Sequence, residues 1–568
     1  MEYPARWFRI ADAACRLGPR PVLLAAWHRG PVARRRALRA LADAPPPHGP
    51  WWPSQAPPPP PGLPAAHRAA VLARAAALAE AGRDWHGPFP AAPHALSLDL
   101  FAAGDIRPVW ERNRWAELPL LAQAARLEPA GGWSHRAAGF LADWAAANPA
   151  FHGPNWACAQ EAALRALHLA LALALLGAAP PPGARGLLAL HGRRIAATPA
   201  YALAQDNNHA ISEPAGLLAC GLLLRDAGWV ATGEARLAAA RRRLIAADGG
   251  FAQLSTGYHR LLLDVLALAE WLRRRHGLPA TGEAAAVRWL HRLVDPATGA
   301  MPRLGHQDGS AFADLALAGP ADARPSLERA ARLLAGAGTT PDPGCAWLGL
   351  AAAPALPPPE PAWVAGGLRG WQAGGARGVL RIGPLRFRPG HADLLHFDLW
   401  DGPRNLLRDG GTGAYNPWHV ALAGTAGHNT VEFDGRGQMP AVSRFLFARW
   451  PRGGPLPDGG WIRDHRGNRH ERRVTPAGRL WRIEDRLAGP WQRAALRWRL
   501  APGPWRLTAD GASGPFARLR IAADGPVTLA LEAGEESLAY GVCTSVPVLV
   551  ARVDRPVCRL TTLVILPD

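Results

Sequence analysis

The apolar residues of this chain change their spacing once, near residues 356–363. From about residue 65 to 345 they recur every three or four positions, as in HRLLLDVLALAEWLRRR from His259, which is typical of amphipathic helices. Beyond the change, short runs such as RLWRIEDRL from Arg479 alternate apolar and polar residues, which is typical of half-buried strands. We therefore expect a helical part followed by an all-β part.

The helical part contains at least eight helical segments rich in alanine, leucine and arginine, which are strong helix formers. Glycine and proline clusters separate them, and no strand pattern lies between. Short connections favour antiparallel helix pairs, and the closed form of such an array is an (α/α) toroid. The regular punctuation of the second part by Gly, Asp and Pro predicts an antiparallel β-sandwich.

A chain of 568 residues is several times a typical domain, so more than one domain is expected. Residues 44–64 are rich in proline, and the pair Trp51 and Trp52 favours a strap that lies over the body instead of a free linker. The predicted units are an N-terminal extension with this strap (1–64), the toroid (65–350), a linker (351–362) and the sandwich (363–568).

Arginine supplies all 64 basic residues, and the net charge is +19. The planar guanidinium suits carboxylates and sulfates, so an anionic partner is one interpretation; codon bias is the other. No nucleic-acid-binding module is recognisable. Charges at Arg6, Arg9 and Arg16 interrupt every candidate signal-peptide core, and the apolar run from Leu167 is too short to predict a membrane span.

Two polar clusters lie at predicted helix starts. In QDNNHAISEPAGLL, from Gln205, the residues Asn207, Asn208 and His209 precede an apolar helix, and Glu213 lies near the start of that helix. They could present donors to an anion, or they could form an ordinary Asx turn. Tyr258 begins the helix after DGGFAQLST; it is one of only five tyrosines, and its alternative is a core tyrosine with a satisfied hydroxyl.

A third cluster lies in the β part. His391 begins a segment that we expect to be extended, and His396 follows within it. Asp409 occupies a Gly-rich turn and His428 begins the next strand. Two histidines and an aspartate from adjacent strands could hold zinc, although the spacing is not that of a standard zinc motif.

These segments together resemble the heparinase II/III-like family of polysaccharide lyases. DIRPVWERNRW (105–115) and WAAANPAFHGPNWACAQEAALR (144–165) resemble motifs of its helical domain, as does NNHAISE. GHADLLHFDLW, LLRDGGTGAYN and AGHNTVEFDG resemble its C-terminal domain. The resemblance implies a toroid joined to a sandwich, with a cleft between them in which uronate-containing polysaccharides such as heparan sulfate or alginate are cleaved by β-elimination.

The resemblance also implies roles for particular residues. Asn208 and His209 fall where the family neutralises the substrate carboxylate, and Tyr258 falls at its catalytic tyrosine. Some members carry a further catalytic histidine where this chain has Pro389. Either Tyr258 serves as both base and acid, or another histidine such as His396 substitutes. We expect the nearby arginines to lower the pKa of the phenol.

The remaining expectations concern ligands and location. Further substrate contacts are expected at Asn207, Trp156, Glu213, Arg114 and His306. His391, Asp409 and His428 match a structural zinc site of several members, and no organic cofactor is implied. The family suggests a periplasmic location. Because no signal peptide is recognisable in the sequence, a cytoplasmic location is the alternative.

Two rival functions remain open from the sequence. A glycoside hydrolase with a helical toroid would use paired carboxylates, for which Glu111, Glu161 and Glu213 are candidates. A non-catalytic protein that binds acidic polysaccharide, such as a capsule component, is the second. The reaction product separates the rivals, since only elimination leaves an unsaturated sugar.

Overall fold

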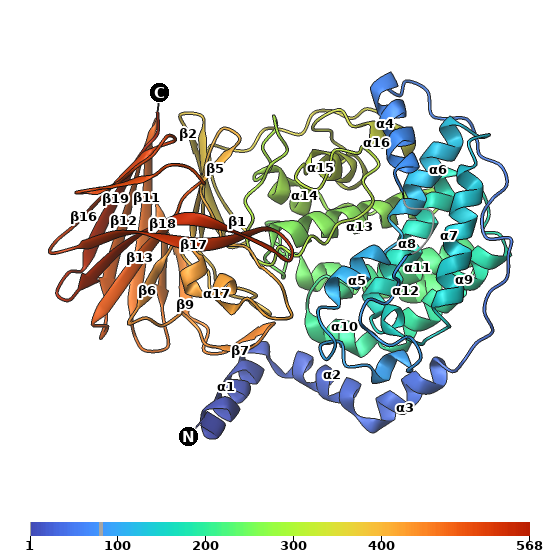
Figure 1. Cartoon of the computed structure of the whole chain (residues 1–568), viewed down its shortest axis with the longest axis horizontal. Helices are drawn as coiled ribbons and strands as arrows, with labels where there is room; N and C mark the ends of the chain where they lie inside the picture. Colours follow the sequence, from blue (N-terminus) through green and yellow to red (C-terminus); the bar gives the residue numbers. More distant parts are fainter. Residues whose placement is uncertain (1, 79–82, 568) are drawn as a thin grey trace.

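The computed structural model describes residues 2–78 and 83–567. A helical half and a β half lie next to each other along the long axis of the molecule (Figure 1). The helices of the described residues are α1 (Glu2–Leu17), α2 (Pro19–Arg29), α3 (Pro31–Ala40), α4 (Ala65–Ala76), α5 (Arg107–Arg112), α6 (Glu117–Leu127), α7 (Trp133–Ala147), α8 (Ala159–Leu175), α9 (Pro182–Ala197), α10 (Pro199–Gln205), α11 (His209–Leu224), α12 (Ala227–Leu244), α13 (Thr256–Arg275), α14 (Ala284–His291), α15 (Arg324–Ala330), α16 (Pro343–Trp347) and α17 (Val420–Ala423).

The helical half is organised around α8 and α11, which are buried along almost their whole length. α11 packs against α8, α9, α12 and α13. Leucine and alanine fill these contacts, and only an element surrounded by others tolerates so little polar surface. The apolar run from Leu167, which is too short to predict a membrane span, begins in the second half of the buried helix α8. No helix in the described part of the chain is long and apolar enough to span a bilayer.

The β half is built from antiparallel sheets. One sheet has the order β1-β2-β3-β4-β5, a second β14-β15-β16-β19-β12-β11-β10-β9, and a third β17-β18-β13-β6. The strands of the described residues are β1 (Ala362–Ala365), β2 (Leu368–Ala373), β3 (Ala376–Arg381), β4 (Phe397–Asp401), β5 (Arg404–Leu407), β6 (Val431–Phe433), β7 (Ala441–Ser443), β8 (Leu446–Phe447), β9 (Arg452–Leu456), β10 (Gly459–Arg463), β11 (Arg469–Ala477), β12 (Leu480–Ala488), β13 (Arg493–Arg499), β14 (Arg506–Thr508), β15 (Gly511–Ser513), β16 (Arg518–Ala523), β17 (Thr528–Ala539), β18 (Val542–Asp554) and β19 (Arg559–Ile565). In β12 the side chains alternate between exposed and buried, as the sequence pattern predicts.

The first sheet belongs to both hydrophobic cores. Trp363, Leu368 and Val379 pack into the helical core, whereas Leu380 and Phe397 pack into the sandwich core. Successive residues of a strand point to opposite faces, so one short sheet can serve both. The last helix of the helical half ends at Trp347, and β1 begins at Ala362, the last residue of the segment expected to be a linker.

The N-terminal extension touches both halves. Arg16, at the end of α1, donates a 3.0 Å hydrogen bond to the carbonyl of Trp450 in the sandwich. Arg20 of α2 forms a 3.2 Å ion pair with Asp206 in the helical half. The proline-rich segment then runs along the outside of the helices (Figure 1) with the Trp52 side chain buried. It therefore lies against the body as a strap.

Candidate functional site

A cleft of about 330 Å³ lies where the two halves meet. Its walls come from the segments that lead into α5, α8, α11 and α13, and from the loops before and after β4 and β5. Six residues expected from the sequence line it together: Arg114, Asn207, Asn208, His209, Tyr258 and His306. Residues up to 192 positions apart in the chain are thus brought to one opening.

The Asn-Asn-His segment is held firmly at the start of α11. Asp206, before it, has a positive φ of 46° and accepts two 2.7 Å hydrogen bonds from Arg243. Asn208 is 3% exposed, and its amide nitrogen Nδ2 has no hydrogen-bond partner among the described residues. A buried amide donor without a partner is costly unless a ligand accepts from it. Asn208 therefore offers a donor to whatever occupies the cleft.

His209 is oriented from within its own helix. Its Nδ1 lies 3.1 Å from Oε1 of Glu213, one turn later, and its ring packs edge-on against Tyr201. The buried Glu213 does not line the cleft. Its contact with His209 makes it a group that positions the imidazole, in place of the direct substrate contact expected from the sequence.

Tyr258 lies in the first turn of α13, where Ser255 caps the helix. Its hydroxyl donates a 2.6 Å hydrogen bond to Oδ2 of Asp308. Burial and the Asp308 carboxylate raise the pKa of Tyr258 well above its usual value, and Arg107 offsets only part of this rise. Arg107 thus lowers the phenol pKa as expected, but burial and the Asp308 carboxylate outweigh it, so the net shift is upward.

Asp308 is the centre of the polar network in the cleft. It also accepts a 3.2 Å hydrogen bond from the Tyr415 hydroxyl, and it lies 3.4 Å from Nε of Arg107. Burial raises the pKa of Asp308, but Arg107 and the Tyr258 hydrogen bond outweigh this and hold the pKa well below its usual range. Asp308 is consequently a carboxylate that keeps two phenols protonated.

Arg114 is bound to acids on the opposite wall. Its Nε and Nη2 donate 2.7 Å hydrogen bonds to both oxygens of Glu161. Glu111 accepts from Arg114 at 2.9 Å and also contacts Arg107. Burial raises the pKa of Glu161, but Arg114 outweighs it and the pKa is lowered overall. These carboxylates serve as counterions to the arginines.

Several cleft residues were not among those predicted. Tyr201, Tyr258 and Tyr415 line the cleft. Tyr540 lies next to them: it donates a 2.5 Å hydrogen bond to Asp105 and accepts one from the backbone nitrogen of Tyr415. Four of the five tyrosines of the sequence are therefore in or beside the cleft. Asp105, Arg107 and Tyr415 lie inside the motifs DIRPVWERNRW and LLRDGGTGAYN. The scarcity of tyrosine in the chain is the signal that could have found Tyr415 and Tyr540.

His306 comes from the loop before Asp308 and lies over the backbone of Gly390. A Cβ atom at residue 390 would be 2.5 Å from two atoms of the His306 ring, so the glycine leaves room for the imidazole. The ring packs edge-on against Tyr415 and against His391, and its Nδ1 has no partner among the described residues. An imidazole thus lies beside the segment that contains Pro389, but it belongs to His306, which comes from a different loop.

His391, Asp409 and His428 form a buried group whose possible ligand atoms all lie within 4.8 Å of one another. Both ring nitrogens of His391 and Nε2 of His428 lack hydrogen-bond partners within the described parts of the chain. Nδ1 of His428 lies 2.9 Å from Oδ2 of Asp409. Orphaned imidazole nitrogens beside a carboxylate fit a metal ion such as zinc, so this group could hold one.

Besides Glu213, two predicted catalytic or substrate-binding residues do not reach the cleft. His396 is fully buried, and its Nδ1 accepts a 2.9 Å hydrogen bond from the backbone of Asn429. The backbone has a positive φ of 61° at Leu395 and β4 begins only at Phe397, so the extended segment expected from His391 starts later, after His396. Trp156 is buried among Trp144, Phe151 and His191, and a fully buried indole has no free face for a sugar.

Part of the β half matches a known protein family. The profile of the family described as Heparinase II/III-like, C-terminal, matches residues 355–514. Residues 355–514, in the β half, are therefore similar to the C-terminal domain of that family. No curated protein sequence matches the chain at a significant level.

Solved structures resemble the chain over nearly its whole length. A crystal structure of heparinase III covers 97% of this chain and 92% of its own, with a TM-score of 0.63 and 13% identity. A mutant of a heparan sulfate lyase from Pedobacter heparinus covers 95% of this chain and 84% of its own, with a TM-score of 0.55 and 16% identity. A chondroitin AC lyase from Streptomyces coelicolor A3, in complex with chondroitin sulphate, covers 94% of this chain and 82% of its own, with a TM-score of 0.52 and 12% identity. The shared fold confirms the predicted toroid followed by a sandwich.

Proposed function

We propose that this chain is a polysaccharide lyase that cleaves a uronate-containing acidic polysaccharide by β-elimination. The observation that carries the proposal is that the Tyr258 phenol and the unpartnered amide of Asn208 line one cleft. The family match and the lyases among the similar structures support the same class of reaction.

The first task of such a site is to stabilise the charge that develops on the uronate carboxylate. The C5 proton is weakly acidic while the neighbouring carboxylate is fully charged. Donors on that carboxylate stabilise the enolate-like state that forms as the proton leaves. Asn208 Nδ2 and His209 supply such donors at the start of α11.

The second task is to move a proton from C5 to the leaving oxygen. In our scheme the Tyr258 oxygen takes the C5 proton while its own proton passes to Asp308, with which it is already hydrogen-bonded. The C4–O4 bond then breaks, the electron pair goes to O4, and O4 takes a proton from Tyr258 as Asp308 returns the one it received. Tyr258 thus acts as both base and acid. His396, the alternative, is buried outside the cleft.

A metal ion held by His391, Asp409 and His428 would have a structural role, fixing the loops that carry Gly390 and Tyr415 at the cleft wall. Zinc is the ion that this donor set favours.

A glycoside hydrolase is disfavoured by the state of the carboxylates. Such an enzyme needs one acid with a raised pKa to protonate the leaving group. Glu161 has a lowered pKa and is bound through both oxygens to Arg114. Glu111 lies against two arginines, and Glu213 contacts His209 without lining the cleft.

The test is the product. Heparin, heparan sulfate, hyaluronan, alginate and bacterial capsule polymers are incubated with the protein, and the absorbance of new unsaturated ends is followed. We expect at least one polymer to give unsaturated ends and the Tyr258→Phe variant to give none. Chain cleavage without that absorbance would instead indicate hydrolysis, and tight binding without cleavage would indicate a binding protein.

A further inference from the structure

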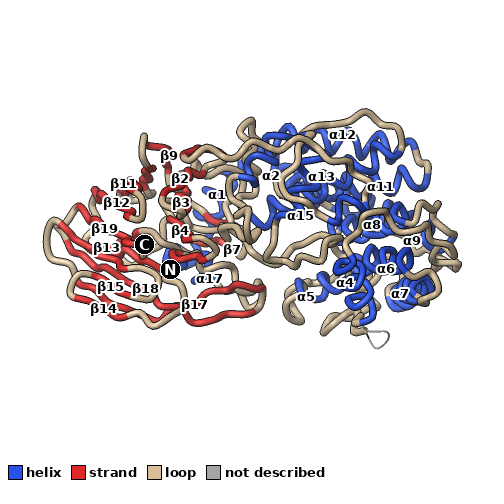
Figure 2. Tube along the Cα trace, turned by 90° about the horizontal axis from the view of Figure 1, so that it is seen from above, coloured by secondary structure: helices blue, strands red, loops and turns tan. Residues whose placement is uncertain are grey.

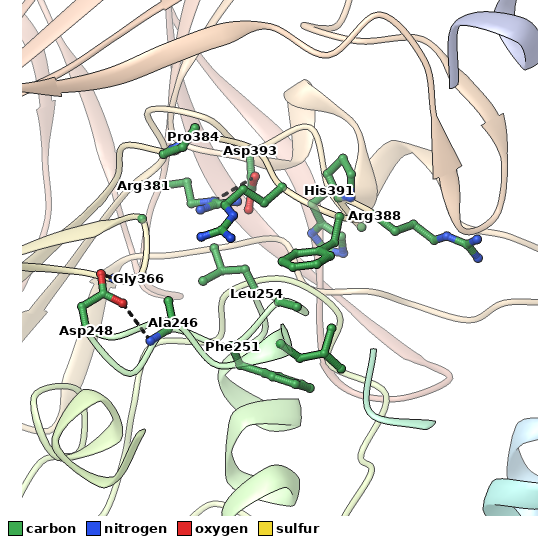
Figure 3. A pocket seen from close by; sticks show the side chains of 18 of the residues that line it. Ala246, Asp248, Phe251, Leu254, Gly366, Arg381, Pro384, Arg388, His391 and Asp393 are labelled. Atoms are coloured by element: carbon green, nitrogen blue, oxygen red, sulfur yellow. Dashed lines mark hydrogen bonds and ion pairs between the residues drawn. The ribbon is translucent and has the colours of Figure 1, made fainter. Parts of the chain in front are cut away.

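A second cavity, of about 160 Å³, opens next to the cleft and is rich in arginine. Figure 3 shows Arg381 against Asp393, with His391 and Arg388 also on its wall. Four arginines line it, and we refer to it as the arginine pocket: Arg243, Arg381, Arg386 and Arg388. Its opposite wall is formed by the segment from Arg243 to Leu254, between α12 and α13.

Arg381 is paired with Asp393 and Arg243 with Asp206, so the cations of the pocket that have no acidic partner among the described residues are Arg386 and Arg388. Asp393 lies 3.5 Å from Nε of Arg381, while Asp248 accepts from the backbone nitrogens of Gly250 and Gly366. Among the described residues Arg386 has no acidic partner. Arg388 donates to an uncharged amide, Oε1 of Gln205, at 2.6 Å, and its Nε has no partner within the part described.

Arg381 is 6% exposed and forms part of the pocket wall. A Cβ atom at Gly367, where φ is +76°, would be 2.9 Å from Nη1 of Arg381, so this glycine gives the guanidinium its space. Burial lowers the pKa of both Arg381 and Arg388, and the carboxylates nearby do not compensate for the lost water. A bound anion would supply the missing compensation.

The arginine pocket is continuous with the cleft on one side and with an open groove on the other. Leu254, Arg388 and Gly390 line both the cleft and the pocket. Arg243, Arg386 and Phe387 line both the pocket and the groove, where the guanidiniums of Arg243 and Arg386 lie 5.5 and 5.3 Å from the Phe387 ring centroid. The groove adds Arg16 and Arg242. A line of cations therefore leads from the cleft to the surface.

We propose that the arginine pocket binds an anionic group of the polysaccharide, a sulfate or a carboxylate, on a sugar beyond the one in the cleft, and that the groove guides the rest of the chain. The inference rests on the proposed function for the identity of the polymer. Guanidinium forks match the geometry of both anions. Charged groups spaced along a polymer can contact successive arginines, so longer chains should bind more tightly than short ones.

The test measures affinity and not turnover, so that it stands apart from the proposed function. Binding of heparan sulfate octasaccharide, of the unsulfated octasaccharide of the same backbone and of the corresponding disaccharides is measured by calorimetry at several salt concentrations. The variants are Arg386→Ala, whose side chain is exposed, and Arg388→Gln. The matched control is Arg506→Ala, an exposed arginine of β14, which lies at the far end of the sandwich from the helical half (Figure 2).

We expect each pocket variant to weaken octasaccharide binding by about tenfold, the loss of one charge-assisted contact, with a shallower dependence on salt. The control should bind as the unaltered protein does. A loss confined to the sulfated octasaccharide assigns the pocket to sulfate, and an equal loss with both assigns it to carboxylate. If both pocket variants bind all octasaccharides as tightly as the control, the inference is wrong, even where the protein still produces unsaturated ends.

Discussion

The Tyr258 hydroxyl and the Asp308 carboxylate lie 2.6 Å apart although fifty residues separate them in the chain. The phenol at the cleft is therefore neutral at physiological pH and bonded to a proton acceptor. This pairing makes proton transfer through Tyr258 dependent on Asp308.

Asp308→Asn tests that dependence. An amide cannot take the phenol proton, so we expect kcat to fall by about 10²-fold or more. Loss of the negative charge also lowers the pKa of Tyr258, so the alkaline limb of the pH profile of kcat/KM should move to lower pH. Asp314→Asn, in the same loop but bonded to the backbone of Ala316 and Gly319, is the control. A profile that keeps its alkaline limb in place would contradict the pairing.

Asn208→Ala removes a donor that has no partner in the part of the chain that the structure describes. The free energy of unfolding should change little, because no hydrogen bond of the side-chain amide nitrogen is lost. We expect kcat/KM to fall on the order of 10²- to 10³-fold, as for other donors to a developing charge. Asn208→Asp should be worse, since its charge repels the substrate carboxylate. Thermal unfolding and steady-state kinetics together check this, and a large loss of stability with normal kinetics would assign Asn208 to the fold alone.

His391→Ala and His428→Ala each remove one of three grouped ligands. We expect both variants to lose the metal on dialysis and to melt at a lower temperature, and a chelator to lower the melting temperature of the unaltered protein in the same way. Metal content is measured by mass spectrometry. His259→Gln is the control, because His259 is equally buried but stacks on Trp289 away from the group. Purified protein that holds no metal and ignores the chelator would refute the site.

Asp485 gives a prediction for stability against pH. Burial raises its pKa, but Arg472 and His470, at 2.7 and 2.6 Å, more than offset this and lower the pKa to about 2. The unfolded value is about 3.9. The contribution to stability is therefore complete above about pH 4 and is lost as the pH falls towards 2.

Asp485→Asn should accordingly destabilise the protein by about 3 kcal/mol at pH 7, because it leaves Arg472 buried without its counterion. The difference from the unaltered protein should shrink as the pH falls from 4 towards 2. Urea unfolding at a series of pH values measures it, and a pH-independent difference would show that the charge is not responsible.

The sequence predicted the local features of the site better than the distant ones. Asn208, His209 and Tyr258 stand at helix starts, where a polar run before an apolar period is visible in one dimension. The partners of Asp308 were not predictable, because its contacts with Arg107 and Tyr415 join segments more than a hundred residues apart. His396 was misplaced because the backbone reversal at Leu395 leaves no mark in the alternation of residue types.

The five-stranded sheet that enters both cores bears on how a polymer can reach the cleft. A hinge between the halves would have to separate Trp363 and Leu368 from one core or Leu380 and Phe397 from the other, and each large apolar side chain exposed would cost about 2 kcal/mol. Rotation of the two halves away from each other about such a hinge therefore has a high free-energy cost. A long chain is expected to slide in lengthwise from the groove, with its entry governed by loops instead of by rotation of whole domains.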